Sequence, residues 1–99
     1  MTLNSICKIC DALSNPTRIR FYVDLLKEPK SIYEIAKKFK VSRPMVYAHL
    51  KKLEEANLVE CKMVIENGRA KKIYKALPFN LSLNPEILEN LVFENQRED

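Results

Sequence analysis

Residues 31–58, SIYEIAKKFKVSRPMVYAHLKKLEEANL, predict two helices joined by a tight turn. Ser31 is a candidate N-cap, and Glu34 three residues later completes the spacing of a capping box. The apolar residues that follow at helical spacing are Ile32, Ile35, Ala36 and Phe39. Lys40 and Val41 interrupt this pattern, so we expect the turn there.

The second helix of this stretch should begin after Ser42, the next N-cap candidate. Pro44 is tolerated because it lies in the first turn, where no intrahelical donor is lost. Val46, Leu50 and Leu53 recur at helical spacing and predict one buried stripe. The remaining face carries Arg43, Pro44, Tyr47, Ala48, Lys51 and Lys52. Two short helices with a cationic outer face on the second are typical of a helix-turn-helix.

Two helices are expected before this unit. Residues 5–13 place Ile6, Ile9, Cys10 and Leu13 at helical spacing. Asn15 and Pro16 form an N-cap followed by proline at the first helical position, which starts a helix that runs to about Lys27. Its predicted buried stripe consists of Ile19, Tyr22 or Val23, and Leu26.

A β-hairpin is expected directly after the helix-turn-helix. Residues 58–65 and 70–77 are rich in strand-forming residues, and Asn67 and Gly68 lie between them. Asn-Gly is the strongest short hairpin signal, because both central residues of a type I′ turn need positive φ. Asn57 should end the preceding helix in a left-handed conformation. A hairpin with a basic tip after a recognition helix indicates a winged helix.

The last predicted helix runs from Pro85, after an Asn84 cap, to about Asn95. Its apolar positions are Ile87, Leu88, Leu91 and Val92. Little of the domain is left to bury them, so we expect helices 5–13 and 85–95 to form a dimer interface. The alternative is that the last helix folds back on its own core. The expected fold is therefore mainly α with a small β-hairpin, a single winged-helix domain over residues 1–99 with about five helices and a two-stranded wing.

The composition is that of one globular domain: 99 residues, 46% hydrophobic and 30% charged. No apolar run approaches the ~18 residues of a membrane span, and the N-terminus lacks the pattern of a secretion signal, so we expect a cytoplasmic protein. The net charge of +4 weakly favours a polyanionic partner. Its placement says more, because residues 37–52 contain lysine and arginine but no acid.

Three segments together resemble the ArsR-type winged-helix transcriptional regulators. Residues 12–20, ALSNPTRIR, are similar to the opening of that family, and residues 41–53, VSRPMVYAHLKKL, resemble its recognition helix. Residues 55–59 and the Asn-Gly-Arg hairpin tip fit as well, so the resemblance covers about residues 10–78. It implies a homodimer that binds an operator near a promoter, usually represses, and responds to an effector that the sequence does not identify.

The sequence departs from the family where metal-sensing members bind their metal. Those members carry a cysteine pair at the start of the helix that here begins near Ser31, but residues 28–33 contain no thiol. The C-terminal helix contains no histidine, and its acids are Glu86, Glu89 and Glu94. We therefore expect no metal site of the usual kind and no cofactor.

The cysteines leave two alternatives open. Three cysteines do not complete a tetrahedral set of thiolates within one chain. Cys7 and Cys10 could make the protein a thiol-, redox- or metal-responsive regulator across a dimer interface; otherwise Cys10 is a small core residue and Cys7 a surface thiol. Cys61 is expected in the core. A further alternative is a winged helix that binds proteins rather than DNA.

His49 is the only histidine, and no nucleophile, carboxylate pair or phosphate loop accompanies it, so we do not expect an enzyme. It either packs at the helix flank or, as the resemblance implies, contacts a DNA phosphate. Arg18 is either a solvated charge or a further phosphate contact.

The partner we predict is double-stranded DNA. Arg43 is a candidate for a guanine edge, and Tyr47 or Pro44 for a thymine methyl. Ser42 and Lys52 would hold phosphates, and Arg69 would probe the minor groove. The full predicted set is Arg18, Ser42, Arg43, Pro44, Tyr47, Ala48, His49, Lys51, Lys52, Asn67, Gly68, Arg69, Lys71 and Lys72.

Overall fold

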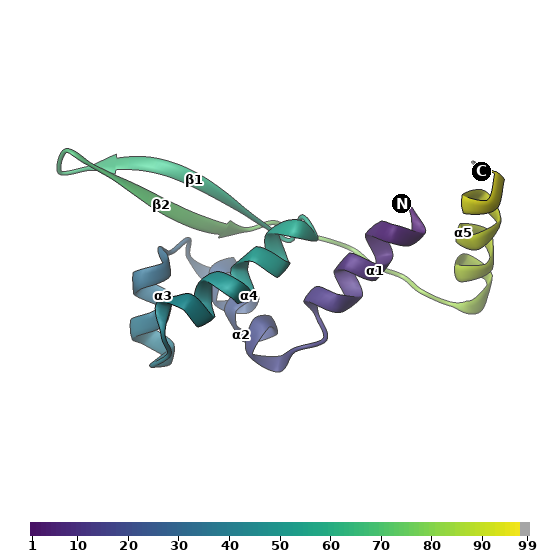
Figure 1. Ribbon diagram of the computed structural model, residues 1–99, viewed down its shortest axis with the longest axis horizontal. Helices are drawn as coiled ribbons and strands as arrows, with labels where there is room; N and C mark the ends of the chain where they lie inside the picture. The colour runs from purple at the N-terminus through teal and green to yellow at the C-terminus, as the bar shows by residue number, and fades with distance from the viewer. Residues whose placement is uncertain (98–99) are drawn as a thin grey trace.

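A computed structural model describes residues 1–97 and contains five helices and one two-stranded antiparallel sheet (Figure 1). In chain order the elements are α1 (Leu3–Ala12), α2 (Pro16–Lys27), α3 (Ile32–Phe39), α4 (Arg43–Glu55), β1 (Val59–Glu66), β2 (Arg69–Ala76) and α5 (Pro85–Arg97). The predicted winged helix-turn-helix, with α3 and α4 as the two helices and the hairpin as the wing, is confirmed.

Local capping fixes where α3 and α4 begin. The Ser31 hydroxyl accepts a hydrogen bond from the Glu34 amide at 3.2 Å, and the Glu34 carboxylate accepts one from the Ser31 amide. Ser42 caps α4 in the same way, through the Met45 amide. The turn between the helices passes through Lys40, which adopts the left-handed conformation at φ 55°. These contacts confirm the predicted boundaries.

The core lies between α4 and the helices beneath it. Val46, Leu50 and Leu53 are fully buried, as the stripe on this helix predicted. They pack with α2 and α3, and the other large side chains of this cluster that are fully buried are Phe21, Leu25, Ile35, Leu58 and Val59. The helix-turn-helix is therefore held by side chains from at least three helices and the first strand.

The predicted buried stripe of α2 is wrong for Ile19 and Leu26, and of the two alternatives Tyr22 and Val23 it is Tyr22 that is buried. Ile19, Val23 and Leu26 are 39%, 45% and 52% exposed. The face of α2 that packs in the core carries Phe21 and Leu25 beside Tyr22. The aromatic residues decide the orientation, because Phe21 packs edge-on against Phe39 and the Tyr22 hydroxyl donates to the Leu77 carbonyl.

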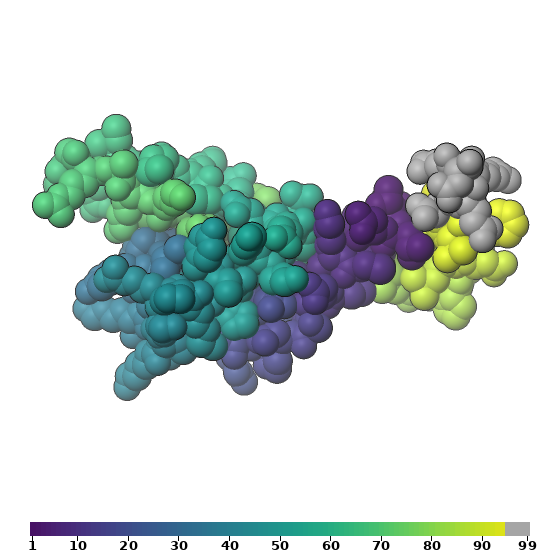
Figure 2. All heavy atoms as spheres, in the orientation of Figure 1, coloured from purple at the N-terminus to yellow at the C-terminus, as the bar shows by residue number. Residues whose placement is uncertain are grey.

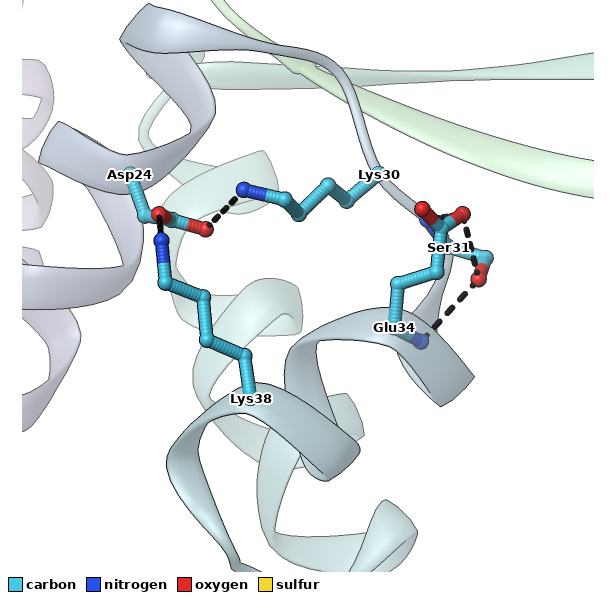
Figure 3. Close-up of polar contacts among 5 residues, drawn as sticks. All are labelled: Asp24, Lys30, Ser31, Glu34 and Lys38. Carbon is cyan, nitrogen blue, oxygen red and sulfur yellow. Dashed lines mark hydrogen bonds and ion pairs between the residues drawn. The ribbon is translucent and has the colours of Figure 1, made fainter.

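A buried carboxylate joins α2 to α3 (Figure 3). Asp24 is 6% exposed and forms ion pairs with Lys30, at 2.7 Å, and with Lys38. Burial tends to raise the pKa of Asp24, but the hydrogen bonds and charges of both lysines outweigh it and lower the pKa below its usual value. The two lysines therefore hold the entry and the last turn of α3 against α2.

The wing is a regular hairpin with its turn at Asn67 and Gly68, which have φ values of 52° and 76° as a type I′ turn requires. Both strands lie within one residue of their predicted positions. Lys30 exchanges two backbone hydrogen bonds with Tyr74, at 3.0 and 2.8 Å, so β2 is paired on both sides along this part of its length. This bridge fixes the base of the wing beside the start of α3.

The terminal helices lie at the far end from the wing (Figures 1 and 2). The molecule measures 52 × 26 × 22 Å along its principal axes, with α5 packed against α1. In α1 the buried residues are Ile6, Ile9 and Ala12, whereas Cys10 is exposed; its expected place in the apolar stripe is therefore wrong. Within residues 1–97 no helix is long and apolar enough to cross a membrane.

Candidate nucleic-acid interface

Helix α4 presents one buried face and one exposed face. Its buried face forms the core described above, which leaves the helix little freedom to rotate. The exposed side chains include every residue predicted for the outer face: Arg43, Pro44, Tyr47, Ala48, Lys51 and Lys52. Ser42, which was predicted to hold a phosphate, is exposed as well and caps the helix. An exposed N-terminal half with a cation and an aromatic ring is the part of such a helix that reaches base edges.

A shallow hollow of about 540 Å³ lies between the start of α4, the start of α3 and the wing. Its lining is mainly apolar, and its charged members are the basic residues Arg43, Lys71 and Lys72. The residues that argue for an interface here are Tyr33, Arg43, Pro44, Tyr47 and Lys72. The fold therefore brings the predicted readout residues Arg43, Pro44 and Tyr47 of α4 together with two predicted wing residues, Lys71 and Lys72.

Tyr33 also lines this hollow, although the sequence did not identify it as a site residue. It is 53% exposed, and the guanidinium carbon of Arg43 lies 5.0 Å from the centroid of its ring. In sequence the two residues are ten positions apart and belong to different helices. Only the crossing of α3 and α4 makes them neighbours, and no spacing rule predicts that crossing for a single pair.

The wing contributes two kinds of basic residue. The Lys71 ammonium lies 3.3 Å from the Glu34 carboxylate and 3.7 Å from that of Glu66. The hydrogen bond to Glu34 raises the pKa of Lys71, so this lysine ties the wing to α3. Within the described residues 1–97, Lys72 and Arg69 form no ion pair; both are exposed.

Asn67 and Gly68 form the exposed tip of the hairpin, and Arg69 follows them as the first residue of β2. The hairpin projects from the body of the domain (Figure 1). Its tip can therefore reach a part of a DNA duplex that lies beside the groove occupied by the recognition helix. The predicted tip residues are thus brought to one place, separate from the hollow.

Arg18 and His49, both half-buried, contact each other. Arg18 donates from Nη1 to the Asp11 carbonyl at 2.8 Å, at the end of α1, and from Nε to His49 Nδ1 at 3.3 Å. Burial, followed by the positive charge of Arg18, lowers the pKa of His49. The His49 ring also packs edge-on against Phe21 at 5.6 Å. These contacts give both residues a role in joining α1, α2 and α4, and a phosphate contact for either stays a prediction.

The two lysines near the end of α4, Lys51 and Lys52, are both exposed. Lys52 pairs with Asp11 at 3.2 Å, with both side chains about half exposed. Such exposed pairs contribute little to stability, so Lys52 can exchange this partner for a phosphate. Lys51 is exposed beside it.

The cysteines lie apart from this surface. Cys7 and Cys10 are both exposed on α1, whereas Cys61 in β1 is half-buried and packs against the edge of the core in which it was expected. In the part of the chain that the structure describes, no three His, Cys, Asp or Glu residues are grouped so that they could hold a metal ion. A thiol-based response through Cys7 and Cys10 stays a hypothesis.

Comparison with known proteins agrees with this geometry. The profile of the family described as bacterial regulatory protein, arsR family, matches residues 15–60. An uncharacterized HTH-type transcriptional regulator of Methanocaldococcus jannaschii is 51% identical over 96 residues, which cover 97% of this chain and 100% of the relative. This chain belongs to the ArsR family. It is a transcriptional regulator with a winged helix-turn-helix DNA-binding domain.

Solved structures share the regulator's fold. An ArsR-like transcriptional regulator from Rhodococcus sp. RHA1 superposes with a TM-score of 0.64 at 26% identity, covering 95% of this chain and 78% of that one. A homodimeric winged helix-turn-helix DNA-binding domain from Mycobacterium bovis gives a TM-score of 0.66 at 16% identity, covering 98% and 81%.

Proposed function

We propose that this regulator is a homodimeric repressor that recognises a specific sequence in double-stranded DNA. The observation that carries the proposal is the exposed face of α4, on which Arg43, Tyr47 and Lys51 project from a helix whose other face is fully buried. A helix held in this way can enter a major groove without rearrangement. Lys52, Lys72 and Arg69 would contact phosphates or the minor groove on either side.

The charge distribution supports a polyanionic partner. Residues 37–52, which include the turn and most of α4, carry lysines and an arginine but no acid. Each lysine that neutralises a phosphate releases condensed counterions, so binding should weaken steeply as salt rises. The charge distribution therefore favours DNA over a protein as the partner of this surface.

The exposed apolar residues of α5 support the homodimer. Leu88, Val92 and Phe93 are 40%, 42% and 58% exposed. The helix that carries them packs mainly against α1. If this face is buried against a second copy, the resulting dimer carries two α4 helices, one from each chain. To contact the same side of one DNA duplex, the two α4 helices must lie about one helical turn of DNA, ~34 Å, apart, or a multiple of that distance. Repression itself is proposed from the family resemblance.

The experiment is a selection from random duplexes with the wild-type protein, followed by binding titrations at two salt concentrations. We expect enrichment of one sequence with two-fold symmetry and affinity that falls strongly with salt. The Arg43→Ala variant should discriminate less at one base pair of each half-site, by about 1–3 kcal/mol. Failure to enrich any sequence, or binding insensitive to salt, would instead support a protein-interaction domain.

The proposal that the protein is a repressor also predicts the direction in which transcription changes. Transcription in vitro from a template that carries the selected sequence at the promoter should fall when the protein is added. A template with that sequence scrambled is the matched control. Increased transcription from the intact template would make the protein an activator.

A further inference from the structure

We propose that Tyr33 is a positioning residue that sets base preference through Arg43. It would do so by holding the guanidinium over its ring before DNA arrives. The inference rests on the proposed function and assigns a specificity-determining role to a residue outside α4. Tyr33 belongs to α3, the helix that precedes the recognition helix.

The geometry at the start of α4 carries the inference. Arg43 is the first residue of that helix, and its guanidinium carbon lies over the face of the Tyr33 ring, 5.0 Å from the centroid. This is within the ~6 Å range in which a cation is attracted to an aromatic face. Within residues 1–97, Arg43 takes part in no ion pair, so its N–H donors are not used by an acid of the protein.

The turn of α3 that carries the ring is held in place by its capping contacts. Tyr33 is the second residue of α3, between the Ser31 cap and Glu34, whose carboxylate closes the capping box. The same carboxylate lies 3.3 Å from the Lys71 ammonium, which connects this turn to the wing. A ring on this capped and tied first turn makes a stable support for an exposed arginine.

The effect of such a support is entropic. A free arginine side chain loses rotamer freedom when it is fixed in one geometry. A side chain already restricted before binding loses less, which improves affinity for the base that it contacts. Guanine offers two acceptors, N7 and O6, in a plane that a guanidinium matches, and a restricted guanidinium therefore favours guanine over other bases at that position.

Three substitutions separate this role from a general one. Tyr33→Ala removes the ring, whereas Tyr33→Phe keeps the ring and removes only the hydroxyl. Lys37→Ala removes the other cation near the ring, whose ammonium lies 6.0 Å from the same centroid, and leaves Arg43 in place. Tyr33 and Lys37 are both exposed, so these changes leave the core intact.

The probes are the duplex that wild-type protein enriches from a random pool and its single-base variants. We expect Tyr33→Ala to reduce discrimination by about two- to fivefold at the base pair where Arg43→Ala acts. Tyr33→Phe should retain wild-type discrimination, and Lys37→Ala should leave base preference unchanged. In a protein that already carries Arg43→Ala, adding Tyr33→Ala should change discrimination no further.

A measurement without DNA tests the contact itself. By NMR, the ring current of Tyr33 should displace the side-chain proton resonances of Arg43 in the wild type and in Tyr33→Phe, but not in Tyr33→Ala. Equal resonances in all three proteins would overturn the inference while the proposed function stands. So would a uniform loss of affinity across all base variants, or a loss in Tyr33→Phe equal to that in Tyr33→Ala. If the wild type enriches no sequence, the proposed function fails first, and this inference fails with it.

Discussion

The two ends of this molecule bury their apolar residues to very different extents. In the helix-turn-helix, Ile35, Val46 and Leu50 have no exposed surface. In α5, Leu88, Val92 and Phe93 keep 40–58% of theirs. Both segments have apolar residues at helical spacing, so periodicity alone does not distinguish them. The difference is what the proposed homodimer would produce, with the helix-turn-helix core complete in one chain and the exposed face of α5 covered by a second copy.

The largest effect is expected where a charge is placed on the uncovered face. Val92→Glu should convert the proposed dimer to monomer, because burial of an unpaired carboxylate in an apolar interface is costly. With only one recognition helix engaged, affinity for the selected duplex should fall by about 10²-fold or more. Sedimentation and DNA titration measure the two effects on the same samples.

The matched control for this change is Asn90→Glu. Asn90 is exposed and lies two positions earlier in α5, so it points to a different side of the helix. The new charge is the same, but it should leave the assembly and the DNA affinity unchanged. A wild-type protein that sediments as a monomer, or dimers that survive Val92→Glu, would remove the assigned difference between the two ends.

The next effect concerns the covered end. Leu50→Ala should lower the free energy of unfolding by about 2–5 kcal/mol, because it leaves a cavity among fully buried side chains. Leu88→Ala removes the same atoms from α5. In protein dilute enough to be monomeric, it should cost less than about 0.5 kcal/mol. Urea unfolding at two protein concentrations measures both; losses of similar size in dilute protein would contradict the comparison.

A smaller effect depends on pH and tests the junction between α2 and α3. Lys30 and Lys38 lower the pKa of Asp24, so the folded state favours the ionised carboxylate. The resulting stability is present above the unfolded-state pKa of about 3.9 and is lost as pH falls through the lower folded-state pKa. Asp24→Asn should therefore lower the free energy of unfolding by about 1–3 kcal/mol at neutral pH.

The same variant should lose less stability than the wild type when the solution is acidified below about pH 4. Urea unfolding at pH 7 and pH 3 gives the difference. Glu28→Gln is the control, because it removes an exposed carboxylate next to the same junction. An equal acid-dependent loss in the Asp24→Asn variant would mean that this carboxylate does not link the two helices.

The accuracy of the sequence predictions follows the same division between local and distant contacts. The helix boundaries at Ser31 and Ser42 and the turn at Asn67 depend on hydrogen bonds or φ values within a few residues, and all were predicted. The stripe of α2 was not, because two apolar faces were available and the packing of Phe21 against Phe39 selected one. That contact joins residues eighteen positions apart on different helices.

The candidate site divides in the same way. Arg43, Tyr47 and Lys51 could be assigned to the outer face of α4 because Val46 and Leu50 define its inner face. Tyr33 could not be assigned, since its role depends on the angle at which α3 meets α4. Nor could the sequence show that Lys71 and Arg18 are held by groups of the protein, because those partners come from other elements.

The smallest effect that we predict compares two neighbouring lysines of the wing. Both lysines line the hollow, but within residues 1–97 Lys72 forms no ion pair, whereas Lys71 pairs with Glu34. If Lys72 neutralises a phosphate, Lys72→Ala should weaken binding to all sequences alike. It should also reduce the slope of log affinity against log salt by about one unit. Lys71→Ala should leave that slope nearly unchanged, because its ammonium already has a carboxylate partner. Titrations of the selected duplex at four or more salt concentrations distinguish the two variants. If both substitutions reduced the slope equally relative to the wild type, the ion pair between Lys71 and Glu34 would have to open when DNA binds.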